Sequence, residues 1–111
     1  MSQNESLDLD RSAMPAFGYI HQHFALEASR LAALGRALVA RASTYGCTLD
    51  GVFVEAIDIA PATLMHLVDT MTLTDNAVLI VPNLLHLSAL GNPLDVQSDL
   101  QSQGIQILTA T

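Results

Sequence analysis

The stretch that decides the fold is Ala77-Val78-Leu79-Ile80-Val81-Pro82, which continues into Asn83-Leu84-Leu85-His86-Leu87-Ser88-Ala89-Leu90-Gly91. Its first part is a short, uninterrupted apolar run, rich in valine and isoleucine and bounded by turn residues. Such a run is typical of a strand that is buried on both faces. Its second part follows the carboxyl end of that strand, where open α/β sheets place their binding sites. We therefore expect a buried central strand with a candidate site directly after it.

Strand and helix patterns alternate on both sides of this run. We expect further strands over 16–23, 49–56 and 105–108. We expect helices over 26–45, from Pro61 through Met71, and from Pro93 to Gly104. Strands that alternate with helices form parallel sheets through crossover connections, with helices on both faces. The sequence therefore predicts an α/β domain with three layers, α/β/α, around a mostly parallel four-stranded sheet.

Helical spacing predicts which side chains face the core. The expected inward residues are Leu31, Leu34, Leu38 and Ala42 in the first helix, Leu64, Leu67, Val68 and Met71 in the second, and Leu94, Val96 and Leu100 in the third. His66 points away from its stripe, so we expect it at the surface. Gly35 lies inside the first helix, where a close packing contact would explain it. Gly46 is placed to end the first helix in a left-handed conformation, and Gly104 is placed to end the third.

Charge and composition restrict the partners. The chain has 111 residues, which suits one domain, and we divide it into a disordered acidic tail over 1–14 and a folded domain over 15–111. Four arginines and no lysine stand against eleven acids, for a net charge of -7. DNA affinity comes largely from cationic side chains that neutralise phosphates, so we expect no direct DNA binding.

Two further expectations concern location. No apolar run approaches the roughly 18 residues that a membrane span requires, so we expect no membrane contact. Cys47 is the single cysteine and cannot form an internal disulfide. That usage fits a cytoplasmic protein in which Cys47 is a small, buried or half-buried side chain.

Several short motifs resemble the catalytic domain of the serine recombinases, the resolvases and invertases. They are Gly18-Tyr19-Ile20, Tyr45-Gly46-Cys47-Thr48-Leu49, Val52-Phe53-Val54-Glu55, Val78-Leu79-Ile80-Val81-Pro82, Leu85-His86-Leu87-Ser88-Ala89 and Gly104-Ile105-Gln106-Ile107-Leu108-Thr109. Their order and spacing match over nearly all of the chain after the tail. The resemblance implies a resolvase-like fold, which agrees with the pattern of strands and helices.

The resemblance also implies where an active site would lie. The family's first strand ends in Tyr-x-Arg-Val-Ser, whose serine is the nucleophile, and here His21 and His23 occupy the arginine and serine positions. The family's third strand ends in Asp-Arg-Leu-x-Arg, and here His86 and Ala89 replace the two arginines. Phosphoryl transfer needs a nucleophile and a positive clamp on the transition state. We therefore expect degenerate active-site positions at these four residues, and no enzymatic strand exchange.

Other parts of the family pattern also differ. The family's loop after the second strand carries a Ser-Gly pair and an arginine, whereas residues 56–61 have neither. The family continues into a long helix that makes the dimer and grips DNA, and then into a DNA-binding domain. Neither follows in this sequence, which again argues against strand exchange.

The histidines allow a second interpretation. His21, His23 and His86 are expected at the carboxyl edge of neighbouring strands, with Asp58 or Glu55 close by. Three imidazoles and a carboxylate could hold zinc or a similar divalent metal, and protonated imidazoles could bind an anion. Alternatively, the histidines only fill positions that lost catalytic residues.

Two hypotheses about function follow. The first is a non-catalytic, recombinase-like domain that acts through protein partners as an interaction, assembly or regulatory module, forming a homo-oligomer and needing no cofactor. The alternative is a small metal- or anion-binding protein, or a hydrolase, that uses the histidine cluster.

Overall fold

The computed structural model describes residues 15–21, 27–55, 62–73 and 77–110, without the side chains of Ala62 and Ala89. Its elements are β1 (Ala16–His21), α2 (Ala28–Tyr45), β2 (Leu49–Glu55), α3 (Ala62–Thr72), β3 (Val78–Val81), the 3₁₀ helix η2 (Leu84–Leu90), α4 (Pro93–Ser102) and β4 (Gln106–Thr109). The alternation of strands and helices that the sequence predicts is confirmed. The predicted tail over 1–14 lies outside the described residues.

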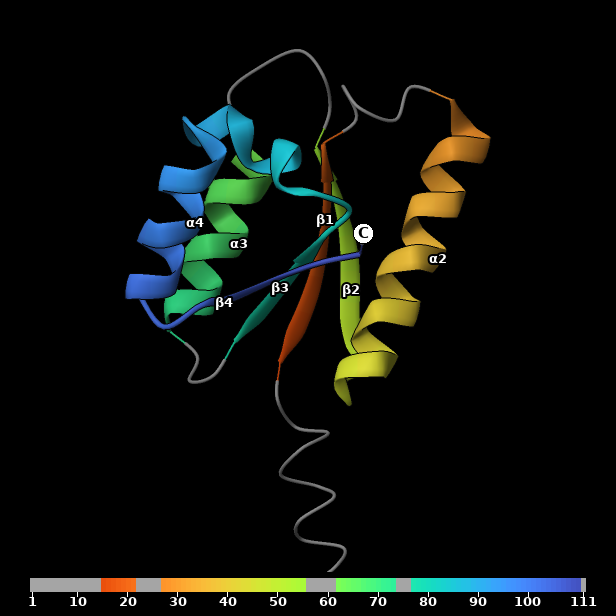
Figure 1. Cartoon of the computed structure of the whole chain (residues 1–111), viewed down its shortest axis with the longest axis horizontal. Coiled ribbons are helices and arrows are strands. Elements are labelled where there is room, and N and C mark those ends of the chain that lie inside the picture. The colour runs from red at the N-terminus through yellow and green to blue at the C-terminus, as the bar shows by residue number, and fades with distance from the viewer. Residues whose placement is uncertain (1–14, 22–26, 56–61, 74–76, 111) are drawn as a thin grey trace, which may run out of the picture.

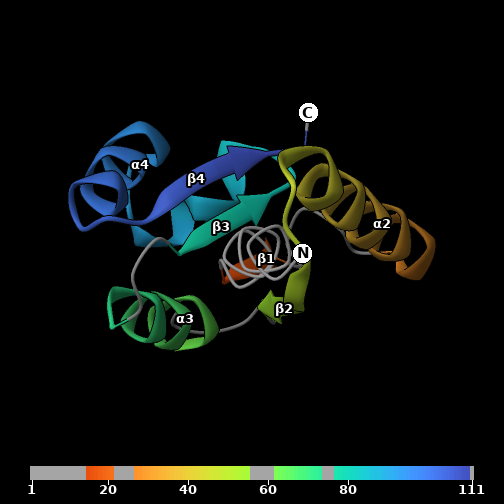
Figure 2. The ribbon, with the colours of Figure 1, turned by 90° about the horizontal axis from the view of Figure 1, so that it is seen from below.

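The four strands form one sheet in the order β2-β1-β3-β4, and every pairing is parallel. Helix α2 covers one face of this sheet, while α3 and α4 lie on the other (Figures 1 and 2). The first strand therefore lies inside the sheet, between β2 and β3. This order leaves β2 and β4 as the two edge strands.

Two apolar cores explain the composition of β3. All four of its residues are fully buried. Val78 and Ile80 pack in the core beneath α2, whereas Leu79 and Val81 pack in the core beneath α3 and α4. Burial of each such side chain contributes roughly 1.5–3 kcal/mol. The uninterrupted apolar run of the sequence is thus a strand that is buried on both faces, as predicted.

The helix ends follow the glycine positions. Gly46 and Gly104 adopt left-handed φ values of 90° and 88°, which an L side chain rarely adopts. The amide of Gly46 donates to the carbonyl oxygen of Ser43, 3.1 Å away, at the end of α2. Cys47 follows as a buried cysteine. Both helix ends and the burial of Cys47 confirm the predictions.

Two predictions about packing are wrong. Leu94 is 64% exposed, although Val96 and Leu100 on the same helix are buried. At 100° per residue Leu94 lies about 200° from Val96, so the two cannot share a face. At Gly35 an added Cβ would meet no atom within 4 Å. Close packing therefore does not explain this glycine.

Element ends differ slightly from the predicted ranges. Helix α2 begins at Ala28, β2 ends at Glu55, and β4 covers 106–109 instead of 105–108. In the described part of the chain, no helix has both the length and the apolar character that crossing a membrane requires.

Candidate functional site

The structure joins two of the predicted site residues at the carboxyl edge of the sheet. His86 lies on η2, directly after β3, and is only 1% exposed. Its Nδ1 atom accepts a hydrogen bond from the backbone N–H of His21, the last residue of β1, at 2.9 Å. His86 therefore ties the end of β1 to the segment that follows β3.

Burial sets the protonation state of His86. Desolvation, together with the smaller effects of the nearby charges of His21 and Arg30, lowers the pKa of its imidazole to about 4. The ring is consequently neutral near pH 7, as an Nδ1 acceptor must be. At that pH it offers no positive charge to an anion.

The metal hypothesis stays a prediction. His23 and Asp58 lie outside the described residues, and Ala89 is described by its backbone alone. Among the residues that the structure describes, no group of three or more histidine, cysteine, aspartate or glutamate side chains could hold a metal ion. Since Nδ1 of His86 already accepts a hydrogen bond, a metal would have to bind at Nε2.

Glu55 ends β2 and holds the start of α3. Its carboxylate is 5% exposed and accepts hydrogen bonds from the backbone N–H of Leu64 at 2.9 Å and of Thr63 at 3.1 Å. The hydroxyl of Tyr19 also donates to it, at 3.3 Å. A carboxylate at a helix N-terminus satisfies unpaired N–H groups and favours the helix dipole. Glu55 is thus a structural anchor between β2 and α3.

The pKa directions agree with this role. Burial alone would raise the pKa of Glu55, but the hydrogen bonds from Leu64, Thr63 and Tyr19 outweigh it and lower the pKa below its usual range. Burial, and then the charge of Glu55, raise the pKa of the Tyr19 phenol. Glu55 is therefore ionised and Tyr19 neutral at pH 7. No local sequence pattern predicts this contact, because Glu55 lies several residues before α3 begins.

The outer edge of β2 is the main feature that sequence analysis missed. Among the strands that the structure describes, β2 pairs only with β1. Val52, Phe53 and Val54 are 37%, 38% and 39% exposed, so three successive apolar side chains reach solvent. A Cβ added at Gly18 would lie 3.2 Å from Val52, on the α2 side of the sheet. Since side chains alternate along a strand, Val52 and Val54 face α2 and Phe53 faces α3.

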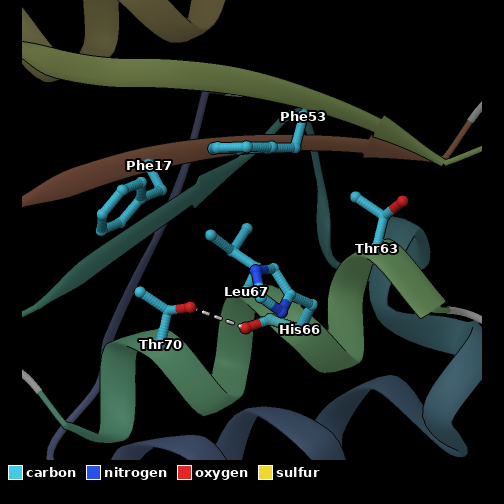
Figure 3. Close-up of a pocket in the computed structure, with 6 residues that line it drawn as sticks. All are labelled: Phe17, Phe53, Thr63, His66, Leu67 and Thr70. Atoms are coloured by element: carbon cyan, nitrogen blue, oxygen red, sulfur yellow. Dashed lines mark hydrogen bonds between the residues drawn. The ribbon is translucent and has the colours of Figure 1, made fainter.

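A groove of about 490 Å³ lies beside this edge, between β2 and one flank of α3 (Figure 3). Its lining residues are Phe17, Phe53, Thr63, His66, Leu67 and Thr70. The rings of Phe17 and Phe53 lie 6.1 Å apart between centroids and are tilted by 50°. His66 is exposed, as predicted, and in addition lines the groove. The groove is largely aromatic on its strand side and more polar on its helix side.

The Phe53 ring lies over Gly51 in the same strand, on the side of Phe17. A Cβ added at Gly51 would lie 3.5 Å from that ring, in ordinary van der Waals contact. The apolar run at 52–54 breaks the alternation that a half-buried strand shows, but by itself such a run predicts a strand buried on both faces. The sequence therefore did not reveal the exposed edge.

Comparisons of the chain with protein-family models, with curated proteins and with solved structures gave no match. The resemblance to the serine recombinases therefore stays a prediction that rests on the sequence motifs.

Proposed function

We propose that this chain is a non-catalytic, recombinase-like domain that serves as an assembly module and forms a homodimer through β2. The observation that carries the proposal is the open, apolar edge of β2, where Val52, Phe53 and Val54 are each more than a third exposed. An edge strand offers unpaired N–H and C=O groups that readily pair with another strand. Proteins commonly protect such edges with lysine, proline or a covering segment, and β2 contains neither of these residues.

The chemistry of the edge favours a second copy of the chain. A strand added to β2 would meet valines on the α2 face and a phenylalanine on the α3 face. It should therefore be apolar on both faces, as β2 itself is. Asp50 is the one exposed acid on β2, since Glu55 is buried against α3. A strongly basic partner would thus find little local charge to pair with.

Symmetry and charge both allow antiparallel pairing. Parallel pairing through the same edge would need a two-fold axis along the strands, which turns one copy over and places its α3 face beside the α2 face of the other. Antiparallel pairing about Phe53 separates the two Asp50 carboxylates by about 20 Å, at roughly 3.3 Å per residue. That distance exceeds the Debye length of about 8 Å at physiological salt, so the two charges are largely screened from each other.

The proposed absence of catalysis rests on the residues at the positions that correspond to the family's active site. His86 stands where the resembling family has an arginine, and it is buried and neutral. Its Nδ1 atom accepts a hydrogen bond from the backbone N–H of His21, which occupies another position where the family has an arginine. A neutral, engaged imidazole cannot clamp a phosphodiester as a guanidinium does.

The test is the oligomeric state of the purified chain, measured by sedimentation equilibrium and native mass spectrometry. We expect a dimer for the wild-type chain and a monomer for Val54→Lys, because a lysine would place a charge within the apolar part of the pairing edge. Leu73→Lys is the matched control. Leu73 is 89% exposed, directly follows α3 and belongs neither to β2 nor to the lining of the groove, so this variant should remain a dimer.

Salt dependence identifies the partner. Each copy carries a net charge of -7, so added salt should strengthen self-association by screening repulsion. Complexes with a basic partner would weaken instead. A wild-type chain that remains monomeric at every concentration and salt level would disprove the assembly proposal.

A further inference from the structure

We infer that the two β2 strands pair antiparallel about Phe53 and that the groove beside β2 receives the Phe53 ring of the second copy. This inference rests on the proposed homodimer and names its register and its central contact.

The register follows from matching exposed apolar residues. Centring the pair on Phe53 sets Phe53 against its own symmetry mate and Val52 against Val54 in both directions. Centring on Val52 would oppose Val54 with the charged Asp50. Centring on Val54 would oppose Phe53 with Glu55, whose carboxylate is held by α3. Only the Phe53 register gives every exposed apolar residue of the edge an exposed apolar partner.

The same symmetry brings the second ring to the groove. A two-fold axis perpendicular to the sheet makes adjacent strands antiparallel and keeps their faces on the same sides. Phe53 faces α3 in this chain, as its contact with Phe17 shows, so the second copy's Phe53 would also lie on that face. Directly opposed residues on paired strands are about 4.5–5.5 Å apart. That ring would therefore stand at the open side of the groove.

The groove suits an aromatic ring in size and lining. Its volume of about 490 Å³ exceeds what one side chain requires, and Phe17 and Phe53 already form a tilted aromatic pair in its wall. A third ring extends this cluster in edge-to-face or offset contacts, which aromatic pairs prefer. On the helix side Leu67 contributes a further apolar surface, and Thr63, His66 and Thr70 form the rim. Anchors of this kind, near the centre of an interface, dominate binding.

Cysteine cross-linking tests the register while it retains Phe53. In a Cys47→Ala background, Val52→Cys and Val54→Cys are made as separate chains and mixed under oxidising conditions. The Phe53 register places position 52 of one chain opposite position 54 of the other, at a Cα distance that a disulfide can bridge. We expect a cross-linked dimer from the mixture and little from either variant alone. Cross-linking of either variant alone to the same extent would overturn the register.

Blocking the groove tests the central contact. Thr70→Trp places a large ring in the groove, and it should raise the dimer dissociation constant about tenfold, equivalent to about 1.4 kcal/mol. The matched control is Thr44→Trp. Thr44 is also exposed on a helix, and its hydroxyl donates to the carbonyl four residues earlier, as that of Thr70 does. This control should leave the constant unchanged. Equal constants for both variants would overturn the groove contact.

A dye provides an independent measurement of groove occupancy. If the second copy's Phe53 fills the groove, 1-anilinonaphthalene-8-sulfonate should bind the Val54→Lys monomer and not the wild-type dimer. Equal dye binding by both proteins would show a groove that takes small aromatic molecules, and would refute the inference. A dimer that Val54→Lys disrupts, but that fails the cross-linking and groove tests, would leave the proposed function intact.

Discussion

The two edges of the sheet differ in how they are protected. At β4 the strand is short, and Ile107 and Leu108 are buried. Side chains of α2 also engage it: Nε of Arg41 donates to the carbonyl oxygen of Thr109 at 3.0 Å, and the hydroxyl of Tyr45 donates to the side chain of Gln106 at 2.7 Å. This edge is therefore covered from the helix layer.

At β2 the strand has seven residues, and three successive apolar side chains reach solvent. At one end of this strand, the Glu55 carboxylate holds the start of α3. One edge of this sheet is covered, and the other is apolar and exposed. A sheet that simply lacked protection would expose both edges, so the difference favours an assembly surface at β2.

The largest effect on stability is expected at the anchored end of β2. Glu55→Gln replaces a buried carboxylate by an amide, in which one of the two oxygens that accept from Thr63 and Leu64 becomes an NH₂ group facing an N–H donor. We expect a loss of about 2–4 kcal/mol in the free energy of unfolding, because buried donors lose a charged acceptor. Urea denaturation at pH 7 measures this loss.

Asp50→Asn is the control for this change, since it removes the same charge from an exposed position on the same strand. It should alter stability by less than about 0.5 kcal/mol. Equal effects of the two substitutions would contradict the role of Glu55 as an anchor.

Acid should weaken two contacts at the carboxyl ends of the strands, those of His86 and of Glu55. The pKa of His86 is lowered from 6.5 to about 4, so the unfolded chain takes up this proton first as pH falls. The stability that His86 contributes is thus complete above about pH 6.5 and is lost toward pH 4, by about 2–3 kcal/mol. The pKa of Glu55 is also lowered, so its contribution holds above about pH 4.5 and is lost at more acid pH.

Urea denaturation at several pH values between 7 and 4 measures this loss. His86→Asn keeps a side-chain acceptor that does not titrate, so its stability should depend less on pH in this range. His66→Gln, at an exposed position, should keep the wild-type pH dependence. If the unfolding free energy of His86→Asn depends on pH as steeply as that of the wild-type chain, His86 is not the responsible group.

The smallest effect is expected at the covered edge. Arg41→Gln removes the hydrogen bond to Thr109, and we expect a loss of about 1 kcal/mol in unfolding free energy with no change in dimer dissociation. Arg36→Gln, at an exposed position on the same helix, should change neither quantity. A loss of dimer in Arg41→Gln would mean that β4, and not β2, forms the interface.

Much of the fold could be predicted from the sequence. The apolar run at 77–81 identifies the central strand, and the stripe of Leu64, Leu67 and Met71 identifies the buried face of α3. Gly46 and Gly104 identify two helix ends. These features can be predicted from neighbouring residues alone. Side-chain burial repeats with the period of the strand or helix, and the backbone conformation at a helix end depends on the residue at that position.

The candidate site could be predicted only in part. The sequence pattern brings His21 and His86 to one edge of the sheet, and the structure places them in contact. It does not reveal that the contact joins a ring to a backbone N–H. It also does not reveal that Glu55 holds α3, since both contacts join residues from different elements.

The sequence by itself determined the order of the elements, the doubly buried strand and the acidic charge that argues against DNA binding. Only the tertiary structure decided that β1 lies inside the sheet and β2 at its edge. That order leaves Val52, Phe53 and Val54 open to solvent and sets the groove beside them. The physical reason is that exposure of a strand's edge depends on which strands pair, and pairing is a long-range choice that no local pattern encodes.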